Sequence, residues 1–229
     1  MTDILVNFPL LTLTAFVGTY FILDRLAPRA MAVLEESLIA IILALMVLLA
    51  FVQVVLRYGF NSGIVGSLEL NRILFAWLIL FGMSYGLKVS AHLGIDSVIR
   101  LLPRPLFRAF AVFGAAAVIL YAVLLIHGTW LTAFGATTKG GGAVDYWVRF
   151  FRLPIGLDDL LYPEWMREFA GQDRVHRWVA YIILPVGLGL LAMRALQALV
   201  EIWQGQRELV IASHEAEELV NENRNILRD

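Results

Sequence analysis

Residues 37–56, SLIAIILALMVLLAFVQVVL, decide the fold. Among these 20 residues only Ser37 and Gln53 are polar. At about 1.5 Å per residue, a helix of this length reaches about 30 Å, which matches the hydrocarbon core of a bilayer. Glu36 precedes the stretch and Arg57 closes it. Because a charge near the bilayer centre costs roughly 2.5–3.5 kcal/mol, these charges fix the ends of a predicted transmembrane helix.

The composition of the whole chain agrees with a lipid environment. The 229 residues are 60% hydrophobic and 16% charged, whereas a soluble domain usually carries about 25% charged residues. The net charge of −1 creates no field that would attract nucleic acid, so we expect membrane lipid and no nucleic acid as a partner. The absence of cysteine removes disulfides, thiolate nucleophiles and cysteine-based metal sites.

Three further apolar stretches predict transmembrane helices. The second span lies between Arg72 and Lys88, whose long side chains can reach the headgroups. The third covers about residues 109–129. The fourth covers about residues 178–193 and is expected to end near Arg194.

Two stretches are less regular. Pro185, Gly187 and Gly189 should bend the fourth span or loosen it locally. Residues 4–23 are long enough to cross the membrane, although polar residues and Pro9 weaken the pattern, so this segment either spans or lies in the interface. We favour a span.

The predicted fold class is an all-α integral membrane helical bundle, with four core transmembrane helices and a possible N-terminal fifth. Residues 1–29 form an N-terminal extension, and residues 30–200 form the four-helix membrane domain. That domain includes a long loop over residues 131–177. Residues 201–229 form a polar C-terminal tail, expected to be an acidic, solvated helix or a frayed tail.

Loop charges predict the orientation. Residues 88–108 carry four basic side chains and one acid, Asp96, so the positive-inside rule places this loop in the cytoplasm. The C-terminus then returns to the cytoplasm, and residues 131–177 lie outside. Both alternatives for the N-terminal segment obey the rule, so charge does not choose between them.

The outer loop contains two distinct segments. Residues 146–152 are aromatic and basic, which predicts an interfacial helix ended by Pro154. Residues 157–165 are acidic and aromatic. The loop could contact a partner or cap the helices, and the sequence leaves both open.

Signatures of catalysis are few. His92 and Asp96 stand four residues apart and could share a helix face, but two ligands do not make a metal site. Asp158 and Asp159 are adjacent and should point apart. The sequence contains no P-loop, no Gly-x-Ser-x-Gly and no His-Glu-x-x-His motif. We therefore expect neither an enzyme nor a bound cofactor.

The predicted spans also lack a polar route. A self-sufficient carrier needs polar groups at mid-membrane, often in repeated halves. The first span offers Gln53, the second Ser84 and the third His127 near its outer end, and no internal repeat is evident. This pattern favours an accessory scaffold. The alternatives are a stand-alone channel or carrier and a membrane-embedded enzyme or sensor subunit.

Charged and small residues mark candidate contacts with a partner. Glu69 and Arg72 stand three apart and could pair along one helix face. Together with Arg57 they could instead meet charges on a partner subunit. Gly82 and Gly86 form a small-xxx-small pair that permits close helix approach.

Four short patterns occur in order around the first two spans: Arg-x-x-Phe-Asn, Glu-x-x-Arg, Phe-x-Trp and His-x-Gly-x-Asp. These patterns supply the candidate interface residues Arg57, Asn61, Glu69, Arg72, Trp77, His92 and Asp96, to which the small-residue pair Gly82 and Gly86 is added. With these patterns, residues 34–200 resemble the small membrane subunit, the DctQ type, of tripartite ATP-independent periplasmic (TRAP) transporters.

The resemblance implies a location and partners. In this family a large membrane subunit carries substrate and sodium and moves as an elevator, while a periplasmic substrate-binding protein captures the substrate. The small subunit packs beside the static scaffold of the large one. The chain is therefore expected in the bacterial cytoplasmic (inner) membrane as a multi-pass protein, supporting sodium-coupled uptake of an organic acid.

Two departures from the family pattern bear on the substrate. The N-terminal extension and the outer loop are both longer than the usual form. The loop motif at residues 163–165 and the tail motif at residues 214–217 look more like subunits of C4-dicarboxylate systems.

Overall fold

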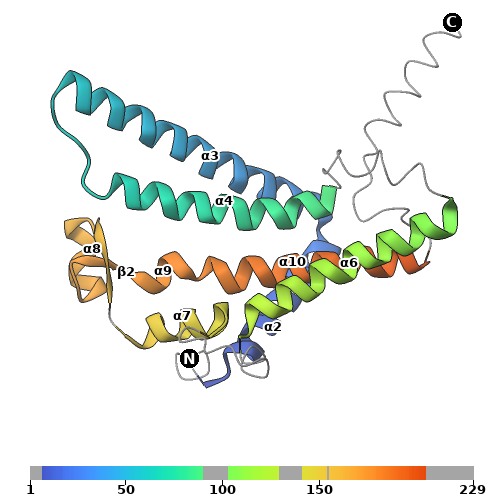
Figure 1. Cartoon of the computed structure of the whole chain (residues 1–229). Helices are drawn as coiled ribbons and strands as arrows, with labels where there is room; N and C mark the ends of the chain where they lie inside the picture. Colours follow the sequence, from blue (N-terminus) through green and yellow to red (C-terminus); the bar gives the residue numbers. More distant parts are fainter. Residues whose placement is uncertain (1–6, 90–102, 129–140, 154, 205–229) are drawn as a thin grey trace, which may run out of the picture. The chain divides into compact units, whose positions relative to one another are not determined.

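The computed structural model describes residues 7–89, 103–128, 141–153 and 155–204 (Figure 1). The long helices are α2 (Pro9–Leu26), α3 (Pro28–Gly59), α4 (Ser67–Val89), α6 (Arg104–Ile126) and α10 (Ile183–Gln204). The short elements are α7 (Ala143–Arg152), β1 (Gly156–Leu161), α8 (Glu164–Ala170), β2 (Arg174–His176) and α9 (Arg177–Tyr181). The predicted all-α class is confirmed, with a two-stranded antiparallel sheet as the one addition among the described residues.

Within the described residues, five helical segments are long and apolar enough to cross a membrane. They are Pro9–Leu26, Pro28–Gly59, Ser67–Val89, Arg108–Ile126 and Arg177–Gln204. Helices α2 and α3 bury few of their side chains, so their apolar surfaces suit a lipid or protein surrounding better than water. The N-terminal segment is thus a helix of spanning length, as predicted.

The first two helices are separated by a single residue. Pro28 begins α3, and the residue before a proline is driven out of the helical conformation, as Ala27 shows with φ −137° and ψ 63°. Helix α3 therefore starts well before residue 37, and Glu35 lies inside it, whereas the sequence placed the acids ahead of the helix. The hydroxyl of Tyr20 donates to the Glu35 carboxylate and joins the two helices.

A compact turn connects α3 to α4. Asn61 adopts a left-handed conformation with φ 48°, which asparagine tolerates better than most residues and which stops the helix. The Ser62 N–H then donates back to the Leu56 carbonyl at 3.0 Å. Gln53 accepts a hydrogen bond from the Ile64 N–H at 2.9 Å. The main polar side chain of the first apolar stretch therefore holds the turn that follows it.

The fourth span is interrupted near its start and continues farther than predicted. Pro185 has no N–H to offer the Tyr181 carbonyl, and Ile182 separates α9 from α10, so the expected irregularity is confirmed. The boundary predicted near Arg194 was wrong, because α10 continues to Gln204. The Arg194 side chain is only 5% exposed and donates to Gln197 at 3.1 Å, so this charge is accommodated within the helix.

The chain divides into two compact units. The first comprises residues 1–82 and 123–190, and the second comprises residues 83–122 and 191–229. In the second unit, α6 and α10 bury small side chains, namely Ala111, Ala115, Ala122, Ala195 and Ala198. The Arg108 guanidinium donates to the Ile202 carbonyl at 3.3 Å, which joins the start of α6 to the end of α10.

In the first unit the helix predicted over residues 146–152 is present as α7, which starts three residues earlier, at Ala143, and ends at Arg152; its place at the membrane interface stays a prediction. It buries Val144, Trp147 and Phe150, which recur every three residues on one face. Pro154, which was expected to end it, lies outside the described residues. The following segment, β1–α8–β2, lies at one end of α9 (Figure 1) and was not predicted as a folded element.

Candidate functional site

The start of α4 is fastened to strand β1. The Glu69 carboxylate accepts hydrogen bonds from the backbone N–H groups of Asp158 at 3.2 Å, Asp159 at 2.8 Å and Leu160 at 3.0 Å. The pairing of β1 with β2 is irregular between Gly156 and Leu161. Because the ladder is broken there, three successive N–H groups converge on one carboxylate and form an anion-binding concavity that the chain fills itself.

Gly66 makes this contact possible. Its φ is +78°, and a Cβ placed on it would lie 2.6 Å from the Asp159 carbonyl oxygen. Both the conformation and the close approach require glycine. The junction of Gly66, Glu69 and residues 158–160, called the α4–β1 junction below, is therefore built on backbone contacts from both sides.

This geometry corrects one local prediction. No ion pair joins Glu69 and Arg72, both of which the structure describes, because the Glu69 side chain turns to β1. The Arg72 side chain is exposed. Glu69 thus acts within the chain, and its contact with a partner subunit stays a prediction.

Trp77 fixes the next part of α4. Its indole N–H donates to the Ala180 carbonyl of α9 at 3.4 Å, and its ring lies 6.1 Å from that of Phe81. Farther along α4, Leu80 lies against α10. A Cβ placed on Gly187 of α10 would lie 2.6 Å from Leu80 Cβ. Glycine at 187 therefore lets α10 approach α4 closely.

The outer loop caps the helix ends of the first unit. Arg177 pairs with Asp158 at 3.1 Å, and its guanidinium lies 5.6 Å from the centre of the Phe150 ring. Phe150 also stacks on Tyr181 at 4.9 Å and meets Tyr146 at 5.0 Å. These contacts favour the capping role that the sequence left open, without bearing on a partner contact.

The remaining candidates are dispersed. Arg57 lies in the last turn of α3 with its side chain exposed, and Asn61 ends that helix. A Cβ on Gly82 would meet nothing within 4 Å, whereas Gly86, on the same helix, is buried. Close packing against described residues is therefore not seen at Gly82. His92 and Asp96 lie outside the described residues.

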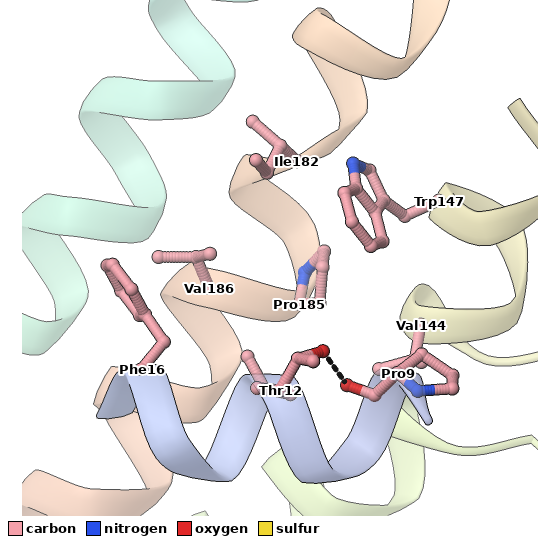
Figure 2. A pocket seen from close by; sticks show the side chains of 9 residues that line it. Pro9, Thr12, Phe16, Val144, Trp147, Ile182, Pro185 and Val186 are labelled. Atoms are coloured by element: carbon pink, nitrogen blue, oxygen red, sulfur yellow. Dashed lines mark hydrogen bonds between the residues drawn. The ribbon is translucent and has the colours of Figure 1, made fainter. Parts of the chain in front are cut away.

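Figure 2 shows a pocket of about 140 Å³ in the first unit. Its lining comes from α2, α7 and the residues around the start of α10: Pro9, Thr12, Leu13, Phe16, Val144, Trp147, Ile182, Pro185 and Val186. None of these side chains is charged, and the Thr12 hydroxyl is already bonded to the Pro9 carbonyl at 2.9 Å. An organic anion would find no counter-charge here, so the pocket is unsuited to a charged substrate.

A metal site is not supported within the described part of the chain, where no three His, Asp or Glu side chains come together. His127 and Asp145 approach to 3.6 Å, but they are only two groups. Asp145 also accepts a hydrogen bond from the Gly142 N–H at 3.0 Å. The pair serves to join the end of α6 to the start of α7.

The fold and these contacts define a class. The chain is a multi-pass helical membrane protein in which Glu69, Trp77 and Arg177 join helices and the outer loop to one another. The chain belongs to the DctQ component family of tripartite ATP-independent periplasmic transporters, whose family profile matches residues 46–205.

Relatives agree with this membership. The chain is 34% identical over 194 residues to the C4-dicarboxylate TRAP transporter small permease protein DctQ of Vibrio cholerae, covering 81% of this chain and 78% of the relative. It is 30% identical over 206 residues to the protein of the same name from Pseudomonas aeruginosa, covering 78% of this chain and 87% of the relative. No solved structure matches the chain significantly.

The family membership settles the broad role. The chain is a small permease subunit of an inner-membrane transporter, and the family works with a large membrane subunit and a binding protein. The matched proteins are transporter permease subunits, which agrees with the expectation that the chain is not an enzyme.

Proposed function

We propose that this chain is the small subunit of a sodium-coupled C4-dicarboxylate TRAP transporter, and that it widens the static scaffold of the large membrane subunit. The substrate class is supported by the names of the relatives from Vibrio cholerae and Pseudomonas aeruginosa. The scaffold role is supported by one observation above others: the described pocket carries no charged side chain that could hold a dicarboxylate.

An elevator mechanism needs a part that stays still while another slides. Helices α2 and α3 present mostly apolar, exposed surface, which suits packing against lipid or against another membrane subunit. The α4–β1 junction and the aromatic contacts of the outer loop hold the first unit in one arrangement. A subunit built this way adds rigid apolar helices to the frame and leaves the substrate to its partners.

The proposal includes an orientation and an interface. The four basic side chains among residues 88–108 support, by the positive-inside rule, a cytoplasmic C-terminus and a periplasmic outer loop. Residues 1–29 add a helix to the family's four-helix domain at 30–200, and residues 201–229 form the tail. Arg57 and Arg72 are exposed and available to a partner. The other interface candidates are Asn61, Glu69, Trp77, Gly82, Gly86, His92 and Asp96.

Reconstitution in liposomes tests the function. Uptake of labelled succinate, driven by a sodium gradient, is expected with the small subunit, the large subunit and the binding protein together. Omitting the small subunit should reduce uptake, and the small subunit alone should give none. Succinate flux through the small subunit alone would make it a carrier and end the proposal.

A further inference from the structure

The pocket lined by α2, α7 and the start of α10 contains a buried polar group without a hydrogen-bond partner. The Trp147 side chain is only 8% exposed, and its indole Nε1 is buried and bonds to nothing in the part of the chain that the structure describes. Figure 2 shows the Trp147 ring reaching from α7 toward Ile182 and Pro185, which also line the pocket. Buried polar groups are almost always hydrogen-bonded, so this N–H indicates an acceptor that is supplied by an occupant of the pocket.

A single water molecule is a poor occupant. A buried water usually makes about three hydrogen bonds. Besides Trp147, the lining has one polar side chain, Thr12, whose hydroxyl proton is already donated to the Pro9 carbonyl. A water that accepts from Trp147 would therefore find few further partners among the lining side chains. The pocket, at about 140 Å³, is close in volume to an engineered apolar cavity of about 150 Å³ in another protein, which stays dry and takes up benzene.

These properties define the chemistry of the ligand. The lining holds no charged side chain, so the part of the ligand that enters it is apolar and uncharged. The indole of Trp147 is a donor only, so the ligand needs an acceptor oxygen and no donor of its own. A hydrocarbon chain that ends in an ester carbonyl meets both requirements. The acyl esters of membrane lipids present this group at the border between hydrocarbon and headgroups, where tryptophan is enriched.

The composition of the pocket favours lipid over a partner subunit. Its lining is most exposed on α2, where Phe16 is 51% exposed, whereas Val144 of α7 is 2% exposed. Helix α2 is long and apolar enough to cross the membrane, so the exposed side of the pocket lies along a predicted span. Helix α2 also lies outside residues 46–205, which the family profile matches. A pocket that depends on α2 is therefore not explained by a large-subunit contact common to the family.

We propose that this pocket binds the acyl ester of a membrane phospholipid. The first carbons of the acyl chain lie against α2 and the start of α10, and the ester carbonyl accepts a hydrogen bond from the Trp147 indole N–H. A volume of about 140 Å³ holds only part of the chain, so the remainder continues into the bilayer. The bound lipid thereby joins α2 to α7 within the first unit. This site is independent of the substrate and of the scaffold role proposed above.

The test uses the purified complex of small and large subunits in detergent. It is titrated with a phosphatidylethanolamine that carries a photoreactive diazirine in one acyl chain, and the adducts formed on illumination are mapped by peptide mass spectrometry. We expect adducts within residues 9–16, 144–147 and 182–186. Unlabelled diester phosphatidylethanolamine should compete with this labelling about five- to tenfold more effectively than the diether analogue, which lacks the carbonyl.

Two variants separate the hydrogen bond from the cavity. Trp147→Phe keeps an aromatic ring but has no N–H, so the diester and the diether should compete equally well. Val186→Phe fills the cavity, so labelling of the three segments should be lost. Trp165→Phe is the matched control: Trp165 is 79% exposed on α8 and does not line the pocket, so this variant should keep the preference of the wild type for the diester.

Four results would overturn the proposal. Labelling confined to other parts of the complex would leave the pocket to a side chain of the large subunit or to water. Unchanged labelling in Val186→Phe would show that the adducts do not come from the pocket. Equal competition by the two lipids on the wild type, or a diester preference that persists in Trp147→Phe, would remove the ester contact with Trp147. Because none of these readouts measures succinate uptake, each result leaves the proposed function standing.

Discussion

The carboxylate of Glu69 lies 2.8 Å from the backbone nitrogen of Asp159, although 90 positions separate the two residues in sequence. Asp158 and Leu160 donate to the same carboxylate. A membrane helix thereby fixes the loop that lies beyond it. The outer loop is therefore attached directly to helix α4, and this attachment gives the first prediction.

Replacing Glu69 by alanine should weaken the attachment of β1 to the start of α4. Three backbone N–H groups lose their acceptor, and because they are partly exposed, water replaces some of the loss, so we expect a cost of about 1–2 kcal/mol. Limited proteolysis of the purified subunit should show faster cleavage within residues 156–176. Glu69→Gln keeps one acceptor oxygen, so its cleavage rate should lie between those of the wild type and of Glu69→Ala. Equal cleavage rates for all three proteins would contradict the junction.

Gly66→Ala should destabilise the same junction by a different route. The substitution combines a left-handed conformation with a 2.6 Å approach of its Cβ to the Asp159 oxygen. We expect a loss of about 1–3 kcal/mol, measured as thermal unfolding in detergent. Gly171→Ala is the matched control, since its φ is +70° but nothing lies within 4 Å. A smaller loss at Gly171 isolates the steric contact, and equal losses would show that conformation alone matters.

Gly82→Ala separates stability from assembly. Because a Cβ there has open space, the substitution should stabilise helix α4 in the isolated subunit by about 0.5–1 kcal/mol. If Gly82 lies against the large subunit, the same variant should recover less of that subunit on co-purification. Normal recovery would remove Gly82 from the interface candidates.

Arg57→Ala should weaken assembly without changing the stability of the subunit alone. The Arg57 side chain is exposed on the last turn of α3. Co-purification with the large subunit and succinate uptake should both fall, while the unfolding temperature should stay the same. Arg72→Ala provides the comparison at the next exposed cation. If the variant co-purifies with the large subunit and supports succinate uptake as the wild type does, Arg57 serves only to anchor the end of α3 at the lipid headgroups.

Cysteine labelling checks the orientation, and the native chain contains no cysteine to interfere. We expect Asp173→Cys to react with a membrane-impermeant maleimide added to intact spheroplasts. Ser213→Cys, in the C-terminal tail, should react only after permeabilisation. The reverse pattern would invert the proposed topology.

Much of the helical frame follows from local properties of the sequence. Uninterrupted apolar runs predicted the spans, and Pro185 predicted the break between α9 and α10, because both effects depend on neighbouring residues. The helix at residues 146–152 was predicted for the same reason, from its run of aromatic and basic residues. The end of α10 was misplaced because Arg194 was assumed to seek the membrane surface, whereas it is buried and bonded to Gln197.

The junction at Glu69 could not be predicted from local patterns. Its hydrogen bonds reach a segment 90 positions away, and the irregular pairing of β1 leaves no periodic signal. The short motif Glu-x-x-Arg suggested an ion pair on one helix face, which is the nearest partner that spacing can offer. The one local hint was Gly66 immediately before α4, since a glycine at a helix start can mark a tight backbone approach.

The single residue between α2 and α3 has a consequence for truncation. Because Ala27 is the entire connection between α2 and α3, the N-terminal helix is not joined to the rest of the chain by a flexible linker. A Cβ on Gly189 would lie 2.9 Å from Val17, so the glycine lets α10 pack closely against α2. Deleting residues 1–27 would therefore remove a packing partner of α10 and expose a groove along that helix, which lipid would have to fill.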